Sequence, residues 1–150
     1  MIRVVTFILL LFIILSCKNK NSSEGNSSTT PPQSELNSTN DTIKDLLKVT
    51  NPAEGQLITS PLEITGEARG YWFFEATASV KLLDGNMDQI AEKHITATGE
   101  WMTEDWVPFS GSIQFEDPLT ENGYLILHRA NPSGLEENAM SDTIPIKFRR

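Results

Sequence analysis

Apolar residues recur at every second position through the C-terminal two thirds of the chain. One run places on a single face the residues Phe74, Ala76, Ala78, Val80 and Leu82. A second run does the same with Leu62, Ile64, Gly66 and Ala68. Because successive side chains of a strand point to opposite faces, this spacing predicts strands with one buried side and one solvent-facing side. No window of comparable length keeps the spacing of an amphipathic helix.

Turn-forming residues separate these runs, and further short apolar runs follow at 113–115, 125–127 and 144–148. About seven short strands within residues 45–150 predict an all-β fold, an antiparallel β-sandwich. Asp84-Gly85 and Asn122-Gly123 are expected to form tight hairpin turns, since these dipeptides suit the positive φ angles that such turns need. Pro145 has no backbone N–H to donate, which places the last strand at a sheet edge.

The N-terminus carries a different kind of apolar run. It extends over the 12 residues from Val4 to Leu15 and ends just before the only cysteine, Cys17. A membrane-spanning helix needs about 20 apolar residues, so this run is too short to cross a bilayer. An apolar run followed by small residues and a cysteine resembles a bacterial lipoprotein signal peptide.

In lipoproteins of that class the cysteine is acylated, for example with palmitate, and becomes the first residue of the mature protein. The resemblance therefore implies lipidation at Cys17 and a protein anchored by lipid to a membrane of the cell envelope. Lys18 stands where some lipoproteins retained in the inner membrane carry aspartate, which favours the outer membrane. The domain would then face the periplasm or the cell surface.

Residues 18–44 are dominated by serine, threonine and asparagine. Such a segment cannot bury enough apolar surface to offset the entropy lost on ordering, so we expect a disordered linker. As a flexible chain it would span roughly 30 Å. The predicted organisation is a signal peptide at 1–16, the lipidated cysteine and polar linker at 17–44, and a β-sandwich domain at 45–150.

The net charge of −8 argues against a nucleic-acid partner, because phosphates require a basic surface. With its one cysteine lipidated, the mature protein would have neither a disulfide nor a free thiol. The fold must therefore rest on apolar burial and backbone hydrogen bonds. Thiolate metal sites and cysteine nucleophiles are excluded on the same ground.

All three tryptophans lie in two short segments, 71–75 and 101–109. If strand alternation continues back from Phe74 on the core face, Trp72 also points to the core, while Phe73 and Glu75 point to solvent. The aromatic side chains either fill the sandwich core or form an exposed platform, rimmed by carboxylates, for a sugar ring or a peptide. The candidate binding residues are Trp72, Phe73, Glu75, Trp101, Glu104, Asp105 and Trp106.

Five segments of the domain, in their order along the chain, resemble a known family. They are 60–66, 68–76, 99–103, 131–134 and 144–148. Together they are similar to the immunoglobulin-like domain associated with bacterial spore germination proteins. The Trp72-Phe73-Phe74-Glu75 and Trp101-Met102-Thr103 stretches are the most specific part of a resemblance that covers residues 48–149. It implies an immunoglobulin-like sandwich that acts as an extracytoplasmic binding or structural module and carries no catalytic residues.

Catalysis finds little support in the residue pattern. His94 and His128 have no serine or cysteine nucleophile motif beside them. The carboxylates of Glu75, Glu104 and Asp105 leave open the less favoured alternative of a glycan-active enzyme with a carboxylate pair. We expect a protein that is not an enzyme.

The turn from Asp84 to Asp88 has oxygen ligands at alternate positions, which resembles the opening of a calcium loop. Such a loop requires glycine at its sixth position and glutamate at its twelfth, where this chain has Gln89 and Ile95. A plain hairpin turn fits better. We expect no metal site and no cofactor.

These observations favour a non-catalytic binding module for an envelope protein or for a cell-wall or surface glycan. The alternative is a structural or assembly lipoprotein of a larger envelope complex. In that alternative, the strand at 144–148 could pair with the sheet edge of a partner.

Overall fold

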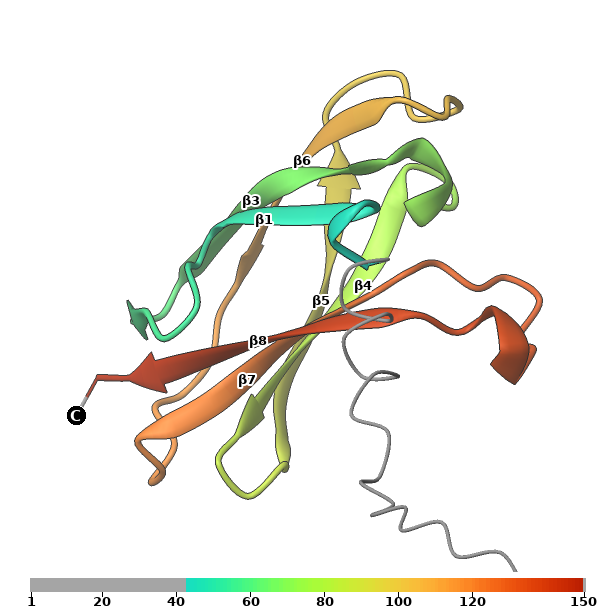
Figure 1. The fold of residues 1–150 in the computed structure, drawn as a ribbon. Helices are drawn as coiled ribbons and strands as arrows, with labels where there is room; N and C mark the ends of the chain where they lie inside the picture. The colour runs from blue at the N-terminus through green and yellow to red at the C-terminus, as the bar shows by residue number, and fades with distance from the viewer. Residues whose placement is uncertain (1–42, 150) are drawn as a thin grey trace, which may run out of the picture. The chain divides into compact units, whose positions relative to one another are not determined.

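A computed structural model of the chain describes residues 43–149 (Figure 1). The predicted signal peptide, the lipidation site and all but the last two residues of the predicted linker lie outside this range. Within residues 43–149, no helix is long and apolar enough to cross a bilayer. The strands are β1 (Leu47–Asn51), β2 (Leu57–Ile58), β3 (Leu62–Arg69), β4 (Thr77–Asp84), β5 (Gln89–Ala97), β6 (Trp106–Ile113), β7 (Asn122–His128) and β8 (Ser141–Phe148). Two short 3-10 helices, η1 (Gly70–Trp72) and η2 (Glu136–Asn138), lie between strands.

The eight strands form one hydrogen-bonded sheet in the order β1-β3-β6-β5-β4-β7-β8-β2. This sheet curls so that the β1-β3-β6 part faces the β5-β4-β7-β8 part (Figure 1). Only two residue pairs, Thr96 with Ser110 and Ala97 with Phe109, join β5 to β6. The prediction of an all-β, immunoglobulin-like sandwich is confirmed, with eight strands in place of about seven.

The core lies between the two facing parts of the sheet. From β3 it takes Leu62, Ile64 and Ala68, as the alternation predicted. From the opposite layer come Val80 and Leu82 of β4, and the remaining strands contribute Ile95, Val107, Phe109, Leu125, Leu127, Ile144 and Ile146. Burying one apolar side chain stabilises a fold by roughly 1.5–3 kcal/mol, so this single cluster carries a domain without a disulfide among its described residues.

The last strand lies near an edge, as Pro145 predicted. β8 pairs with β7 along its length, and on its other side only the two-residue β2 runs parallel to it. The Pro145 carbonyl accepts a hydrogen bond from Gly55 N–H, and Lys147 N–H donates to the Gln56 carbonyl. Residues 55–58 therefore already pair with the edge of β8, at the positions where a partner strand would have to bind.

The two predicted hairpin turns have different outcomes. Asp84-Gly85 begins the connection between β4 and β5, which are antiparallel neighbours, so the hairpin is confirmed. The connection extends over residues 85–88, however, and its positive φ angle lies at Met87 and not at Gly85. Asn122-Gly123 instead begins β7, and β6 and β7 are not neighbours in the sheet. At Gly123 an added Cβ would overlap the ring of Phe148, so this glycine serves close packing between β7 and β8 and forms no hairpin.

Candidate binding site

The helix η1 interrupts the alternation at the end of β3. Trp72 has no exposed surface and Phe73 is only 4% exposed, whereas Phe74 is 47% exposed. The expectation that Phe73 faces solvent and Phe74 faces the core is therefore wrong. One 3-10 turn shifts the chain out of strand register, so that two consecutive aromatic side chains point inward and the third points outward.

A strained turn follows directly. Phe74 and Thr77 exchange two backbone hydrogen bonds of 3.0 Å, which closes a two-residue turn over Glu75 and Ala76. Both turn residues have positive φ angles, 50° and 60°. Left-handed backbone is disfavoured for residues with a Cβ, by about 1–2 kcal/mol each. Backbone strain of this kind often marks functional sites, and here it lies beside the exposed ring of Phe74.

Gly70 allows the segment 101–105 to lie against η1. A Cβ added at Gly70 would overlap the backbone carbonyl oxygens of Trp101 and Thr103. Its N–H donates to the Asp105 carbonyl over 3.1 Å. This close backbone approach holds Trp101 beside the aromatic residues of 71–74, which are distant in sequence.

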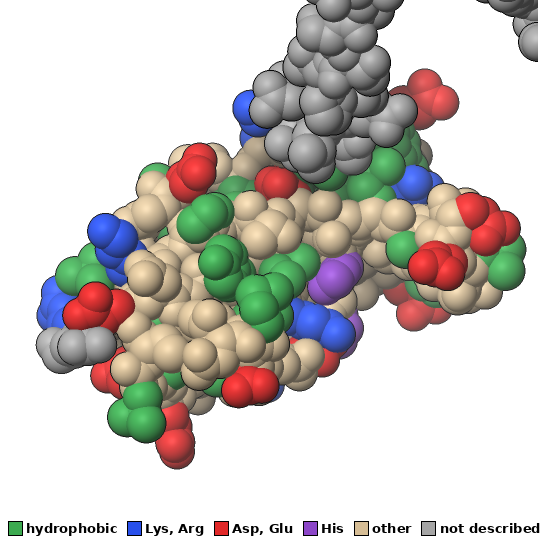
Figure 2. Space-filling view, turned by 60° about the horizontal axis from the view of Figure 1, so that its bottom comes forward, with side chains coloured by type: hydrophobic (Ala, Val, Ile, Leu, Met, Phe, Trp, Pro, Cys, Tyr) green, Lys and Arg blue, Asp and Glu red, His purple; other side chains and the backbone are tan. Residues whose placement is uncertain are grey.

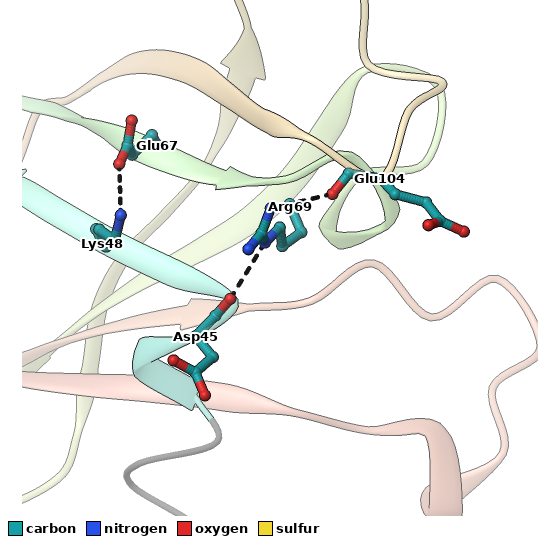
Figure 3. Close-up of polar contacts among 5 residues, drawn as sticks. All are labelled: Asp45, Lys48, Glu67, Arg69 and Glu104. Carbon is teal, nitrogen blue, oxygen red and sulfur yellow. Dashed lines mark hydrogen bonds and ion pairs between the residues drawn. The ribbon is translucent and has the colours of Figure 1, made fainter.

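Arg69 secures the same loop from the other side (Figure 3). Its guanidinium donates to the carbonyl oxygens of Asp45 and Glu104, at 3.3 and 3.4 Å. The Arg69 guanidinium also lies 4.4 Å from the ring centre of Trp106, and the Lys48 ammonium lies 3.7 Å from it. Lys48 in turn forms an ion pair of 2.8 Å with Glu67 (Figure 3). Trp106 is thus engaged by two cations on β1 and β3.

The loops at this end enclose an open pocket of about 510 Å³. This volume lies within the usual range of roughly 300–1,000 Å³ for ligand pockets. The exposed aromatic rings of Tyr71 and Phe74 belong to its wall, together with Met102, which is 74% exposed. The remaining lining residues are Gly70, Phe73, Trp101, Thr103, Glu104, Arg129, Ala130 and Pro132.

Two charged side chains line this largely apolar pocket, Glu104 and Arg129. The Arg129 guanidinium lies 5.8 Å from the ring centre of Tyr71. Arg129 Nε is buried and has no hydrogen-bond partner among the described residues. The ring nitrogen of Trp72, in the adjacent core, is unpaired in the same way.

The pocket unites only some of the predicted binding residues. Phe73, Trp101 and Glu104 line it, and Trp72 lies in the core next to Phe73. Glu75, Asp105 and Trp106 do not line it. Sequence reasoning missed as site residues Tyr71, Phe74, Met102, Arg129 and Pro132. Tyr71, Phe74 and Met102 adjoin predicted residues in the chain, and Pro132 lies in the segment 131–134 that carries the family resemblance. Arg129 had no signal beyond its position near that turn.

The turn after β4 shows how the suspected calcium loop is built. Asp84 Oδ1 accepts hydrogen bonds from the N–H groups of Asn86 and Asp88, at 2.8 and 3.0 Å. The carboxylate thereby acts as the internal acceptor of its own turn. No group of three or more histidine, cysteine or acidic side chains within residues 43–149 is arranged to hold a metal ion.

Titratable groups with shifted pKa values lie on β5, β7 and β8, outside the pocket. Burial lowers the pKa of His128, and nearby Lys81 lowers it further. A hydrogen bond from Ser79 lowers the pKa of the exposed Glu92, whereas burial raises the pKa of Asp142. Figure 2 shows a face on which histidine side chains lie beside hydrophobic and basic ones. None of these three shifted groups contacts the pocket, so none points to chemistry there.

A model of the family described as the immunoglobulin-like domain of bacterial spore germination matches residues 46–135. That range contains all of β1 to β7 and every residue that lines the pocket. No curated protein and no solved structure matches the chain. Domains of this immunoglobulin-like type are binding or structural modules and are typically non-catalytic.

Proposed function

The chain belongs to the family of immunoglobulin-like domains of bacterial spore germination, and from this premise we propose that it is a lipid-anchored cell-envelope protein whose domain binds a protein partner. The apolar run before Cys17 supports the anchor, and the polar segment 18–44 supports a tether between membrane and domain. The proposed location is the outer membrane, with the domain facing the periplasm or the cell surface.

One observation supports the binding role: exposed apolar side chains surround the pocket, and buried aromatic side chains lie next to them. Tyr71, Phe74 and Met102 stay accessible, whereas Phe73 in the pocket wall and Trp72 in the adjacent core are buried. Contiguous apolar surface of this kind on a soluble domain usually marks an interaction site. Aromatic side chains in a fixed pocket are also the typical anchors of protein interfaces.

The lining favours an apolar side chain of a protein over a sugar. Most of the exposed lining is apolar, and five of its eleven residues offer no side-chain hydrogen bonds: Phe73, Phe74, Met102, Ala130 and Pro132. A sugar ring needs several polar partners for its hydroxyl groups, and burying them unpaired costs about 1–3 kcal/mol each. A methionine at the rim suits adaptable protein contacts.

The same geometry supports a role without catalysis. Glu75, Glu104 and Asp105 are all exposed, whereas a glycosidase acid needs an environment that raises its pKa. The assembly alternative gains no support from the edge of β8, because residues 55–58 cover it.

Site-specific photo-crosslinking in the native cells tests the proposal. A benzophenone amino acid replaces Met102, and a matched control replaces Leu119, which is 97% exposed and lies outside the pocket. We expect a reproducible protein adduct from position 102 only, abolished by Phe74→Ser in the same chain. Equal adducts from both positions, or glycan fragments alone at position 102, contradict a protein partner in the pocket.

The anchor is tested separately, by metabolic labelling with a clickable palmitate analogue. Wild-type protein should take up the label and Cys17→Ser should not. An unlabelled wild-type chain would remove the lipid anchor while leaving the pocket untouched.

A further inference from the structure

We propose that the group bound in the pocket carries a carboxylate that pairs with Arg129. This inference rests on the proposed function, because it names the chemistry of the partner that the pocket binds. An apolar side chain fills the pocket, and an adjacent carboxylate meets the guanidinium.

The first observation is the lack of a partner for Arg129 in an acidic domain. Residues 43–149 contain 17 acidic and 8 basic side chains, so carboxylates outnumber cations about two to one. Arg129 nevertheless forms no ion pair among these residues, and its buried Nε donates to no acceptor. A bound carboxylate would give this guanidinium an ionic partner, which the described residues do not supply.

The second observation is that Arg129 is held in place before any ligand binds. Its own N–H donates to the Met140 carbonyl over 2.8 Å. The N–H of the next residue, Ala130, donates to the Trp72 carbonyl over 2.9 Å, so the segment that follows β7 is bonded to η1. The guanidinium also lies 5.8 Å from the ring centre of Tyr71, at the outer range of a cation–π contact. A preorganised guanidinium loses little entropy when it pairs with a carboxylate.

Glu104 determines at which side of the pocket the carboxylate of a ligand should bind. It lines the same pocket, but it makes no ion pair with Arg129. A carboxylate of the ligand is attracted to Arg129 and repelled from Glu104, so it should settle at the Arg129 side. The site therefore fits a peptide in which an apolar or aromatic side chain stands next to a carboxylate, either of the chain terminus or of an acidic residue.

Three small probes separate these sources of the carboxylate. N-acetyl-phenylalanine carries a terminal carboxylate, N-acetyl-aspartyl-phenylalanine amide carries a side-chain carboxylate, and N-acetyl-phenylalanine amide carries none. Each is titrated into the intact lipoprotein in nanodiscs, and binding is followed by the NMR signals of the Trp101 indole and the Ala130 amide.

We expect at least one carboxylate probe to bind about 5–10-fold more tightly than the neutral amide. Charge-assisted hydrogen bonds support this difference, since 1.4 kcal/mol corresponds to a factor of ten. Arg129→Gln should reduce the preference to less than twofold while affinity for the amide stays unchanged. Glu104→Gln should raise the affinity of the favoured carboxylate probe, because it removes the repelling charge from the same pocket.

The outcomes distinguish this inference from the proposed function. Equal affinity of the wild-type protein for the amide and both carboxylate probes overturns the carboxylate and leaves the apolar pocket in place. A preference that persists in Arg129→Gln overturns the role of Arg129. Failure of all three probes to shift either signal overturns the proposed binding pocket itself. Thermal melting of each variant confirms that it remains folded.

Discussion

The turns at the two ends of β4 differ in backbone conformation and in the hydrogen bonds that stabilise them. After β4, Asp84 accepts two backbone N–H bonds within its own turn, in which Met87 is the one residue with a positive φ angle, 70°. Before β4, Glu75 and Ala76 adopt positive φ angles that neither residue type favours. The first turn only connects two strands, whereas the second adjoins the pocket and presents Phe74.

This contrast indicates that the turn before β4 lowers the stability of the domain. Natural sequences tend to be locally consistent with their fold, and departures concentrate at functional or strained sites. The turn after β4 has a single residue with positive φ, Met87, and the carboxylate of Asp84 stabilises that turn with two hydrogen bonds. The turn before β4 keeps a costly conformation beside exposed aromatic rings, and this supports a function at that end.

The largest loss of stability should come from replacing Trp72, which is buried in the core next to the pocket. Trp72→Ala removes a fully buried indole and should destabilise the domain by about 3–5 kcal/mol. Trp101→Ala is the matched comparison, since Trp101 is only partly buried, and it should cost clearly less while weakening binding in the pocket. Chemical denaturation of both variants measures the difference. Equal losses would show that Trp101 belongs to the core.

A smaller loss should follow from breaking the well-formed turn. Asp84→Ala removes the acceptor of two backbone N–H groups and should destabilise the domain by about 1–3 kcal/mol. Asp84→Asn keeps one acceptor oxygen and should lose less. Denaturation midpoints at neutral pH compare the two variants. If Asp84→Ala left stability unchanged, the assumed contrast between the turns would be wrong.

The smallest effect should be a gain at the strained turn. Replacing Glu75-Ala76 with Asn-Gly supplies residues that accept positive φ angles and should stabilise the domain by about 1–2 kcal/mol. The same change at Gly85-Asn86, neither of which has a positive φ angle, gives the control and should bring no gain. Thermal melting checks both double variants. A loss of stability at 75–76 would mean that these side chains make contacts that outweigh the strain.

The fold was predictable because strand alternation is a local signal. The runs at 62–68 and 78–82 each expose one polar face and bury one apolar face, so their burial followed from spacing alone. The strand β5 gave a weak signal because Glu92, Lys93 and His94 are all exposed and only Ile95 is fully buried. The first strand, β1, was missed for a similar reason, since Leu47 is its one buried residue.

The site was only half predictable, for two physical reasons. A three-residue 3-10 helix reversed the orientation of Phe73 and Phe74, and nothing in the alternation signals such an interruption. Arg129 reaches the pocket through the pairing of distant segments, because Ala130 bonds to Trp72 and Gly70 packs on Trp101. Contacts of that kind depend on the whole fold and leave no pattern in neighbouring residues.

The short strand β2, which covers the edge of β8, has a consequence for copies of the domain held close together. Exposed sheet edges can template intermolecular β-pairing, which leads to aggregation. The two edge strands of the sheet are β2, which has two residues, and β1, which has five. β1 also has a register irregularity after Val49 and an exposed Lys48. Short, irregular and charged edges resist such pairing. Domains held side by side at high density should therefore stay separate, each with its own pocket free.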